Sequence, residues 1–183
     1  ATVASIDAVS TVAFSVDARP IDINGTTAFY LGSSKLIQDS GSHFSEDTAA
    51  YFGFTGGGTT GTRLYAWDGN GSGGGTGMTF ADVADGDWYH FDVHVHLTGP
   101  GRNTWDVTVY DEGGALVGSL AGLGFRTDYV DITRLGLLCN GGGSGMYFDN
   151  LVLADVPEPT SLALFGLGGA VAVIAALRRR RRA

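Results

Sequence analysis

Hydrophobic and polar residues alternate in short runs over most of this chain, and turn-forming residues separate the runs. A period of two is typical of a β-strand with one buried face, and Gly, Asn, Asp and Ser between runs indicate turns. The runs predict strands near residues 11–17, 27–31, 49–54, 62–67, 88–97, 104–111, 115–120, 130–139 and 146–154. We expect the Gly-rich stretches 56–61 and 69–77 to be loops. About nine short strands at hairpin spacing predict an all-β domain, an antiparallel β-sandwich or jelly roll.

The clearest hairpin covers residues 88–110, where both strands alternate regularly. Residues that pair across two strands share a face of the sheet, so the apolar positions must pair with each other. Two registers meet this condition: one places His94 opposite Asp106, and the other is shifted by two residues. In both, one face belongs to the core and the other forms a polar face, which carries His90, Asp92, His94, His96, Asp106 and Tyr110.

Three interpretations of this polar face stay open. It is an ordinary exposed surface, a ligand face that hydrogen-bonds sugar hydroxyls, or a site for a divalent metal, because imidazole and carboxylate groups are ligands of Zn and Cu. Alternate residues of a strand lie about 7 Å apart, so three of them reach one ion only if the sheet is curved.

The pattern changes after residue 155. Pro157, Glu158 and Pro159 precede an uncharged stretch over residues 160–177, and the chain then carries the cluster Arg178, Arg179, Arg180, Arg181 and Arg182. As a helix the uncharged stretch would span about 27 Å, close to the hydrocarbon core of a bilayer at about 30 Å. The arginines favour the cytoplasmic side. We therefore predict a β-sandwich domain over residues 1–155, followed by a segment over 156–183 with one transmembrane helix.

This segment closely resembles the PEP-CTERM sorting signal of Gram-negative bacteria. The resemblance rests on Val156, Pro157, Glu158, Pro159, the apolar stretch with its glycines, and the arginine cluster at 178–182. It implies processing by an exosortase, a membrane-embedded enzyme that cuts near the tripeptide. It also implies export, transient anchoring in the inner membrane, and release or attachment at the cell surface, typically in strains that make extracellular polysaccharide.

Charge and cysteine content narrow the function classes. Residues 1–155 hold all but one of the 19 acidic residues and all but five of the 11 basic residues, a balance of −12. A domain this acidic, without a basic patch, is a poor partner for nucleic acid or anionic lipid. Cys139 is the single cysteine, so no internal disulfide forms, and we expect it to be a small buried residue in a strand.

A second resemblance covers residues 85–155. Trp88-Tyr89-His90, the run from Trp105 to Val109, and the final run from Met146 to Leu153 are similar to the latter half of a concanavalin A-like (laminin-G-like) jelly roll. The final run is also similar to carbohydrate-binding modules, which implies a structural Ca²⁺ at Asp149. The alternative is that Asp149 accepts a hydrogen bond from the backbone.

The sequence predicts a protein that is not an enzyme. Sandwich glucanases carry Glu-x-Asp-x-x-Glu on one strand, and the three glutamates here do not fit that spacing. We expect an exported matrix or surface protein that binds or embeds in extracellular polysaccharide, with aromatic side chains stacking on sugar rings: Tyr65, Trp67, Trp88 and Trp105. The alternatives are that these aromatics form the core of a structural or self-associating coat protein, or that the protein binds divalent metal.

Overall fold

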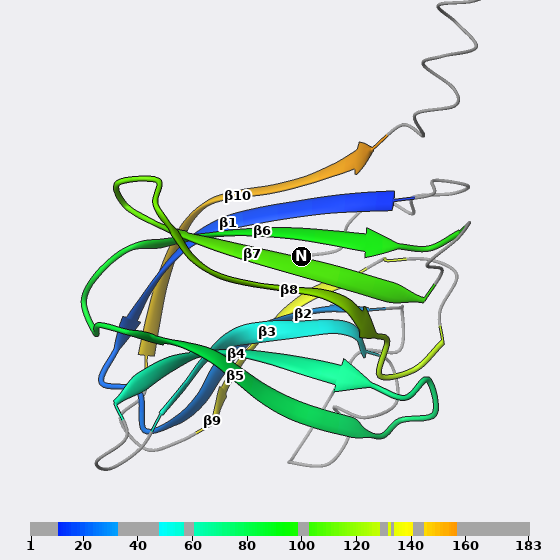
Figure 1. The fold of residues 1–183 in the computed structure, drawn as a ribbon, viewed down its shortest axis with the longest axis horizontal. Coiled ribbons are helices and arrows are strands. Elements are labelled where there is room, and N and C mark those ends of the chain that lie inside the picture. Colours follow the sequence, from blue (N-terminus) through cyan, green and yellow to red (C-terminus); the bar gives the residue numbers. More distant parts are fainter. Residues whose placement is uncertain are drawn as a thin grey trace, which may run out of the picture.

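The protein is an antiparallel sandwich of two five-stranded sheets (Figure 1). A computed structural model describes residues 11–32, 48–56, 61–98, 103–128, 132, 134–140 and 145–156. Within these ranges, no helix is long and apolar enough to cross a membrane. The helix predicted over residues 160–177 and the arginine cluster lie outside them. The predicted all-β sandwich is confirmed.

The first sheet, here called the β1 sheet, has the order β10-β1-β6-β7-β8. Its strands are β1 (Thr11–Ile21), β6 (Tyr89–His96), β7 (Thr104–Asp111), β8 (Leu116–Gly124) and β10 (Gly145–Val156). The second, the β3 sheet, has the order β5-β4-β3-β2-β9. Its strands are β2 (Gly25–Gly32), β3 (Thr48–Gly56), β4 (Thr62–Gly69), β5 (Gly75–Val83) and β9 (Arg134–Asn140).

The core lies between the two sheets and consists of alternate side chains of the strands. In β1 the side chains of Val12, Phe14, Val16 and Ala18 are buried and their neighbours are partly exposed. Phe52 of β3 lies at the centre, with its ring centroid 5.7 Å from those of Phe14, Phe29 and Phe91 and 6.0 Å from that of Trp105. Large rings from both sheets therefore interlock, so the sandwich needs no disulfide to close it.

The predicted hairpin is present, and its register is the first of the two alternatives. Val93 pairs with Val107, His94 with Asp106, and Val95 with Trp105. The four apolar members of these pairs are fully buried, whereas His94 is exposed. The polar face predicted from the sequence is therefore the outer face of the β1 sheet.

Each of the nine predicted strands overlaps a strand of the structure, but β5 is missing from the prediction and begins inside the stretch 69–77, which we expected to be a loop. Its sequence contains few large apolar residues because β5 is an edge strand of the β3 sheet. A register shift between Leu64 and Tyr65 in its pairing with β4 also interrupts the alternation.

Cys139 lies in a strand, as expected, but it is exposed rather than buried. It stands next to the last residue of β9, which is an edge strand of the β3 sheet. The edge position explains the exposure, since no further strand of the described chain covers it on that side.

The pairing of β1 with β10 contains a bulge that the sequence did not reveal. Ser15 pairs with Val152 and Asp17 with Asp149, so two residues of β10, Asn150 and Leu151, lie opposite Val16 alone. Asn150 has a φ of 51°, a left-handed conformation that Asn tolerates better than most residues. Bulges change the direction of a side chain, and this one directs Asn150 toward β1.

Candidate functional site

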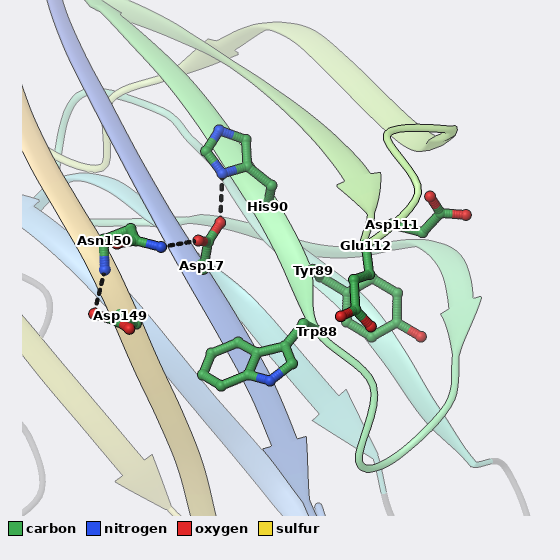
Figure 2. A pocket seen from close by; sticks show the side chains of 8 residues that line it. All are labelled: Asp17, Trp88, Tyr89, His90, Asp111, Glu112, Asp149 and Asn150. Carbon is green, nitrogen blue, oxygen red and sulfur yellow. Dashed lines mark hydrogen bonds and ion pairs between the residues drawn. The ribbon is translucent and has the colours of Figure 1, made fainter.

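A pocket of about 310 Å³ opens on the outer face of the β1 sheet (Figure 2). It is lined by Asp17, Trp88, Tyr89, His90, Asp111, Glu112, Asp149 and Asn150. These residues come from β1, from the start of β6 and Trp88 just before it, from the end of β7 and Glu112 just after it, and from β10 at its bulge. Four of the lining side chains are carboxylic acids, and His90 is the single basic one.

Asp17 is the centre of the hydrogen bonds in the pocket. Its neighbours in β1, Val16 and Ala18, point into the core, so Asp17 points outward, directly opposite His90 of β6. Its Oδ1 lies 2.6 Å from Nδ1 of His90, and its Oδ2 accepts a hydrogen bond of 2.6 Å from Nδ2 of Asn150. Figure 2 shows these contacts bridging three adjacent strands. They fix the orientation of the carboxylate.

The same contacts shift the ionisation of the pair. Partial burial acts to raise the pKa of Asp17, but the hydrogen bonds from Asn150 and His90 outweigh it, so the pKa lies below its ordinary value. Partial burial acts to lower the pKa of His90, but Asp17 and Asp92 outweigh it and hold that pKa above its ordinary value. Asp17 is thus a carboxylate near neutral pH, available as an acceptor.

Trp88 supplies the apolar part of the pocket. It precedes β6 and is partly exposed, and Figure 2 shows its indole at one side of the pocket, below Asp17 and Glu112 in this view. The next residue, Tyr89, is buried, and its hydroxyl accepts a hydrogen bond of 2.9 Å from the backbone N–H of Ala84. An aromatic face beside oriented acceptors suits ligands with an apolar face and several hydroxyl donors, whereas the carboxylates disfavour anions.

The six residues of the predicted polar face share the outer face of the sheet, but only His90 lines the pocket. Asp92 contacts Nε2 of His90 at 3.2 Å, and Tyr110 of β7 pairs with His90 of β6. His96 and Asp106 form a separate pair at 2.8 Å, with the backbone N–H of Gly122 donating to Asp106 at 2.7 Å. These hydrogen bonds outweigh partial burial and lower the pKa of Asp106. Four of the six residues, His90, Asp92, His96 and Asp106, therefore belong to two separate hydrogen-bonded groups.

The two metal hypotheses receive no support from these positions. Among the described residues, no group of three or more His, Cys, Asp or Glu side chains is placed to hold a metal ion. Asp149 lies in the pocket, and its Oδ1 accepts a hydrogen bond of 2.8 Å from the backbone N–H of Asn150. This is the backbone hydrogen bond predicted as the alternative to a Ca²⁺ site. A Ca²⁺ at this position stays a prediction, and Asp149 is the single protein ligand predicted for it.

The four aromatic residues expected to stack on sugars lie in three different places in the structure: the core, the pocket and the outer face of the β3 sheet. Trp105 is fully buried, and its Nε1 donates to the carbonyl of Gly124 at 3.2 Å, so the expectation is wrong for Trp105 because its alternation places it in the core. Trp88 lies in the pocket. Tyr65 and Trp67 lie on the outer face of the β3 sheet, since Leu64 and Ala66 between them are buried.

Asp17, Tyr89, Asp111, Glu112 and Asn150 are the pocket residues that sequence reasoning did not select. Asp17 could have been placed on an outer face from the alternation in β1, but its proximity to His90 depends on the pairing of strands 73 residues apart. Asn150 depends on a bulge. Asp111 and Glu112 stand at a turn, where acidic residues are ordinary.

The predicted sorting residues begin where the last strand ends. Val156 is the final residue of β10 and pairs with Thr11 at the start of β1. Pro157, Glu158 and Pro159 and the arginines at 178–182 lie outside the described residues.

Comparison with known families finds a match to the PEP-CTERM protein-sorting motif over residues 155–182. No curated protein matches the chain. Among solved structures, a marine PL-14 alginate lyase from Aplysia kurodai is similar, with a TM-score of 0.51 and 14% identity over 81% of this chain and 70% of that one. The globular domain of T. cruzi calreticulin is also similar, with a TM-score of 0.51 and 13% identity over 92% and 74%.

At such identities, the solved structures show a shared fold alone, the jelly-roll type of β-sandwich. The match at 155–182 covers the predicted sorting residues and confirms that prediction. The chain thus carries a PEP-CTERM protein-sorting motif, the mark of an exported protein, directly after a β-sandwich.

Proposed function

We propose that this chain is a non-catalytic protein of the cell surface or extracellular matrix whose sandwich binds extracellular polysaccharide. The binding site is the pocket on the outer face of the β1 sheet, here called the Trp88 pocket. An exosortase-type enzyme processes the chain at the sorting motif after transient anchoring in the inner membrane. The motif at 155–182 supports the export and processing part of the proposal. A fold shared with an alginate lyase, named for its action on a polysaccharide, is compatible with a carbohydrate ligand.

The observation that carries the proposal is Trp88 beside the fixed carboxylate of Asp17. A sugar ring has an apolar face of C–H groups that stacks on an indole, and hydroxyl groups at its rim that donate to carboxylates. Asn150 and His90 hold Asp17 at 2.6 Å each, so its remaining acceptor capacity is oriented before a ligand arrives. Four acidic side chains in the pocket favour neutral sugars over acidic ones.

Affinity electrophoresis of the full chain, in a mild non-ionic detergent, tests this. Gels with a neutral polysaccharide should retard the protein, and Trp88→Ala should weaken the retardation about tenfold, the order expected for one aromatic contact with its burial. Tyr147→Ala is the matched control, because Tyr147 is an aromatic residue outside the pocket with 59% of its surface exposed. If both variants and the parent have equal mobility in every gel, including one made with polysaccharide from the producing strain, the pocket is not a polysaccharide-binding site.

A second candidate is self-association, and one feature favours it. In the described part of the chain, β10 has a neighbouring strand on one side only, and it carries four large exposed apolar residues: Tyr147, Phe148, Leu151 and Val152. Unpaired edges with apolar side chains pair with other chains. Light scattering should show that Leu151→Lys with Val152→Lys lowers the molar mass of any oligomer, whereas Leu116→Lys, on a more exposed residue of β8, should not. A monomeric parent protein would exclude this candidate.

A further inference from the structure

Arg126 lies among aromatic side chains on the outer face of the β3 sheet, on the opposite side of the sandwich from the Trp88 pocket. Its guanidinium carbon is 4.5 Å from the centre of the Trp67 ring. Tyr51 packs against both other aromatics here, with centroid distances of 5.6 Å to Tyr65 and 6.4 Å to Trp67. We call Tyr51, Tyr65, Trp67 and Arg126 the Arg126 shelf.

Glycines in the neighbouring strand allow the rings of the shelf to lie down on the sheet. A Cβ atom at Gly77 of β5 would overlap the Tyr65 ring, and one at Gly75 would overlap the Trp67 indole. The two rings therefore occupy the space that side chains of β5 would take, an arrangement known to stabilise glycines in sheets. The result is a broad aromatic surface over β4 and β5.

The position of Arg126 is fixed by a contact between the two sheets. Gly69 at the end of β4 and Gly124 at the end of β8 touch so closely that a Cβ on either would overlap the backbone of the other segment. This contact brings residues 125 and 126 against the end of β4. The Nε of Arg126 then donates to the carbonyl of Gly73 at 3.1 Å, which orients the guanidinium plane over Trp67.

This guanidinium still has hydrogen-bonding capacity. In the ranges that the structure describes, no carboxylate lies within ion-pair distance of Arg126; the ion pairs found there involve His90 and His96 on the other sheet. The Nε bond uses one of its five N–H donors. Such a fork binds a carboxylate through two parallel hydrogen bonds, which a lysine cannot do.

We propose that the Arg126 shelf binds carboxylate-bearing sugar units of an acidic polysaccharide. The guanidinium of Arg126 pairs with the carboxylate of one sugar unit, and Tyr65 contacts the apolar face of the adjacent sugar ring in the polysaccharide. Arg126 places a cation on this face, whereas the carboxylates of Asp17, Asp92 and Asp106 lie on the opposite face beside His90 and His96. The site goes beyond the neutral-sugar pocket at Trp88 and would let one domain hold two kinds of polysaccharide chain.

The test compares mobility of the full chain, in mild non-ionic detergent, in gels that contain polygalacturonate or its fully methyl-esterified form. Polygalacturonate should retard the parent protein and the ester should not. Arg126→Met keeps an apolar stem over Trp67 and removes the charge, so it should lose at least about tenfold in affinity for polygalacturonate. Arg126→Lys should restore only part of that affinity, because it supplies charge without the fork.

Arg19→Met is the matched control. Arg19 also lies over an aromatic ring, 5.7 Å from the centre of Tyr147, but on β1 of the other sheet, and its loss removes the same charge. It should leave polygalacturonate binding unchanged. Equal losses in the Arg19 and Arg126 variants, full binding by Arg126→Met, or equal retardation by polyglutamate would overturn the proposal. Trp88→Ala should keep polygalacturonate binding, so failure of the pocket and failure of the shelf give different results.

Discussion

At the scale of single residues, the pocket depends on a carboxylate that three strands hold in place. Asp17, His90 and Asn150 are ordinary polar residues in the sequence, and each owes its role to a neighbour far along the chain. His90 was identified from the alternation in its own strand. Its partner Asp17 was not, because alternation assigns a face but does not say which strands are adjacent.

These contacts predict a pH dependence of stability. The pKa of His90 is raised on folding, so its stabilisation is complete below the unfolded pKa near 6.5 and is lost as the pH rises through the folded value. The pKa of Asp17 is lowered, so its stabilisation is complete above the unfolded value near 3.8 and is lost as the pH falls through the folded value. The pair contributes most between about pH 4 and pH 6.5.

Thermal melts of the parent and of His90→Gln between pH 5 and pH 8 check this. The difference between the two proteins should shrink as the pH rises, and it should not exceed about 1 kcal/mol because the pair is partly exposed. His94→Gln serves as the control, since His94 is exposed and faces solvent. A difference between parent and His90→Gln that grows from pH 5 to pH 8 would contradict the assigned direction.

At the scale of strands, alternation in both members of the β6–β7 hairpin was sufficient to give its faces and to leave two registers. Packing of Trp105 against Phe52 in the other sheet belongs to the register that the structure has. Edge strand β5 and the bulge at Asn150 could not be derived in the same way. Strand β5 has too few apolar residues to show an alternation, and the bulge depends on how β10 pairs with β1.

The contact of Gly69 with Gly124 predicts that a single methyl group disturbs the join between β4 and β8. Gly124→Ala places a Cβ against the carbonyl of Gly69, and Gly124 also donates its backbone N–H to Asp68 at 2.8 Å. Overpacking of this kind should lower the free energy of unfolding by about 1–3 kcal/mol. Urea denaturation measures it.

The control for this variant is Gly145→Ala. No atom lies closer than 3.9 Å to a Cβ at that position, and Gly145 is not in the left-handed region. Its midpoint should stay near that of the parent. If Gly124→Ala is as stable as Gly145→Ala, the two sheets are not held together at this point as described.

At the scale of the whole molecule, the folded sandwich and the sorting motif are contiguous. The last strand pairs up to Val156, and the motif match begins at residue 155. A cut near Pro157 would therefore release the sandwich with its final strand complete. The sequence was sufficient to identify the motif, because it is a local pattern of residue types, whereas the Trp88 pocket and the Arg126 shelf required the pairing of distant strands.

Replacement of Pro157, Glu158 and Pro159 by alanine should abolish processing in a strain that has the sorting enzyme. The change removes the residues that the sorting enzyme would recognise, and it replaces prolines, which resist helix, by alanines, which favour it. Fractionation and mass spectrometry should then find the chain at full mass in the membrane. Shedding of this variant at the rate of the parent would argue against exosortase processing.

The most direct test of the account follows the processed protein in a strain that makes extracellular polysaccharide and the sorting enzyme. Cells that produce the parent chain or Trp88→Ala are separated into membrane, polysaccharide and medium fractions, and each fraction is assayed by mass spectrometry for the sandwich domain. We expect the parent, cleaved, in the polysaccharide fraction and the variant, equally cleaved, mainly in the medium. Parent and variant distributed alike between polysaccharide and medium would contradict the claim that this pocket binds the polymer.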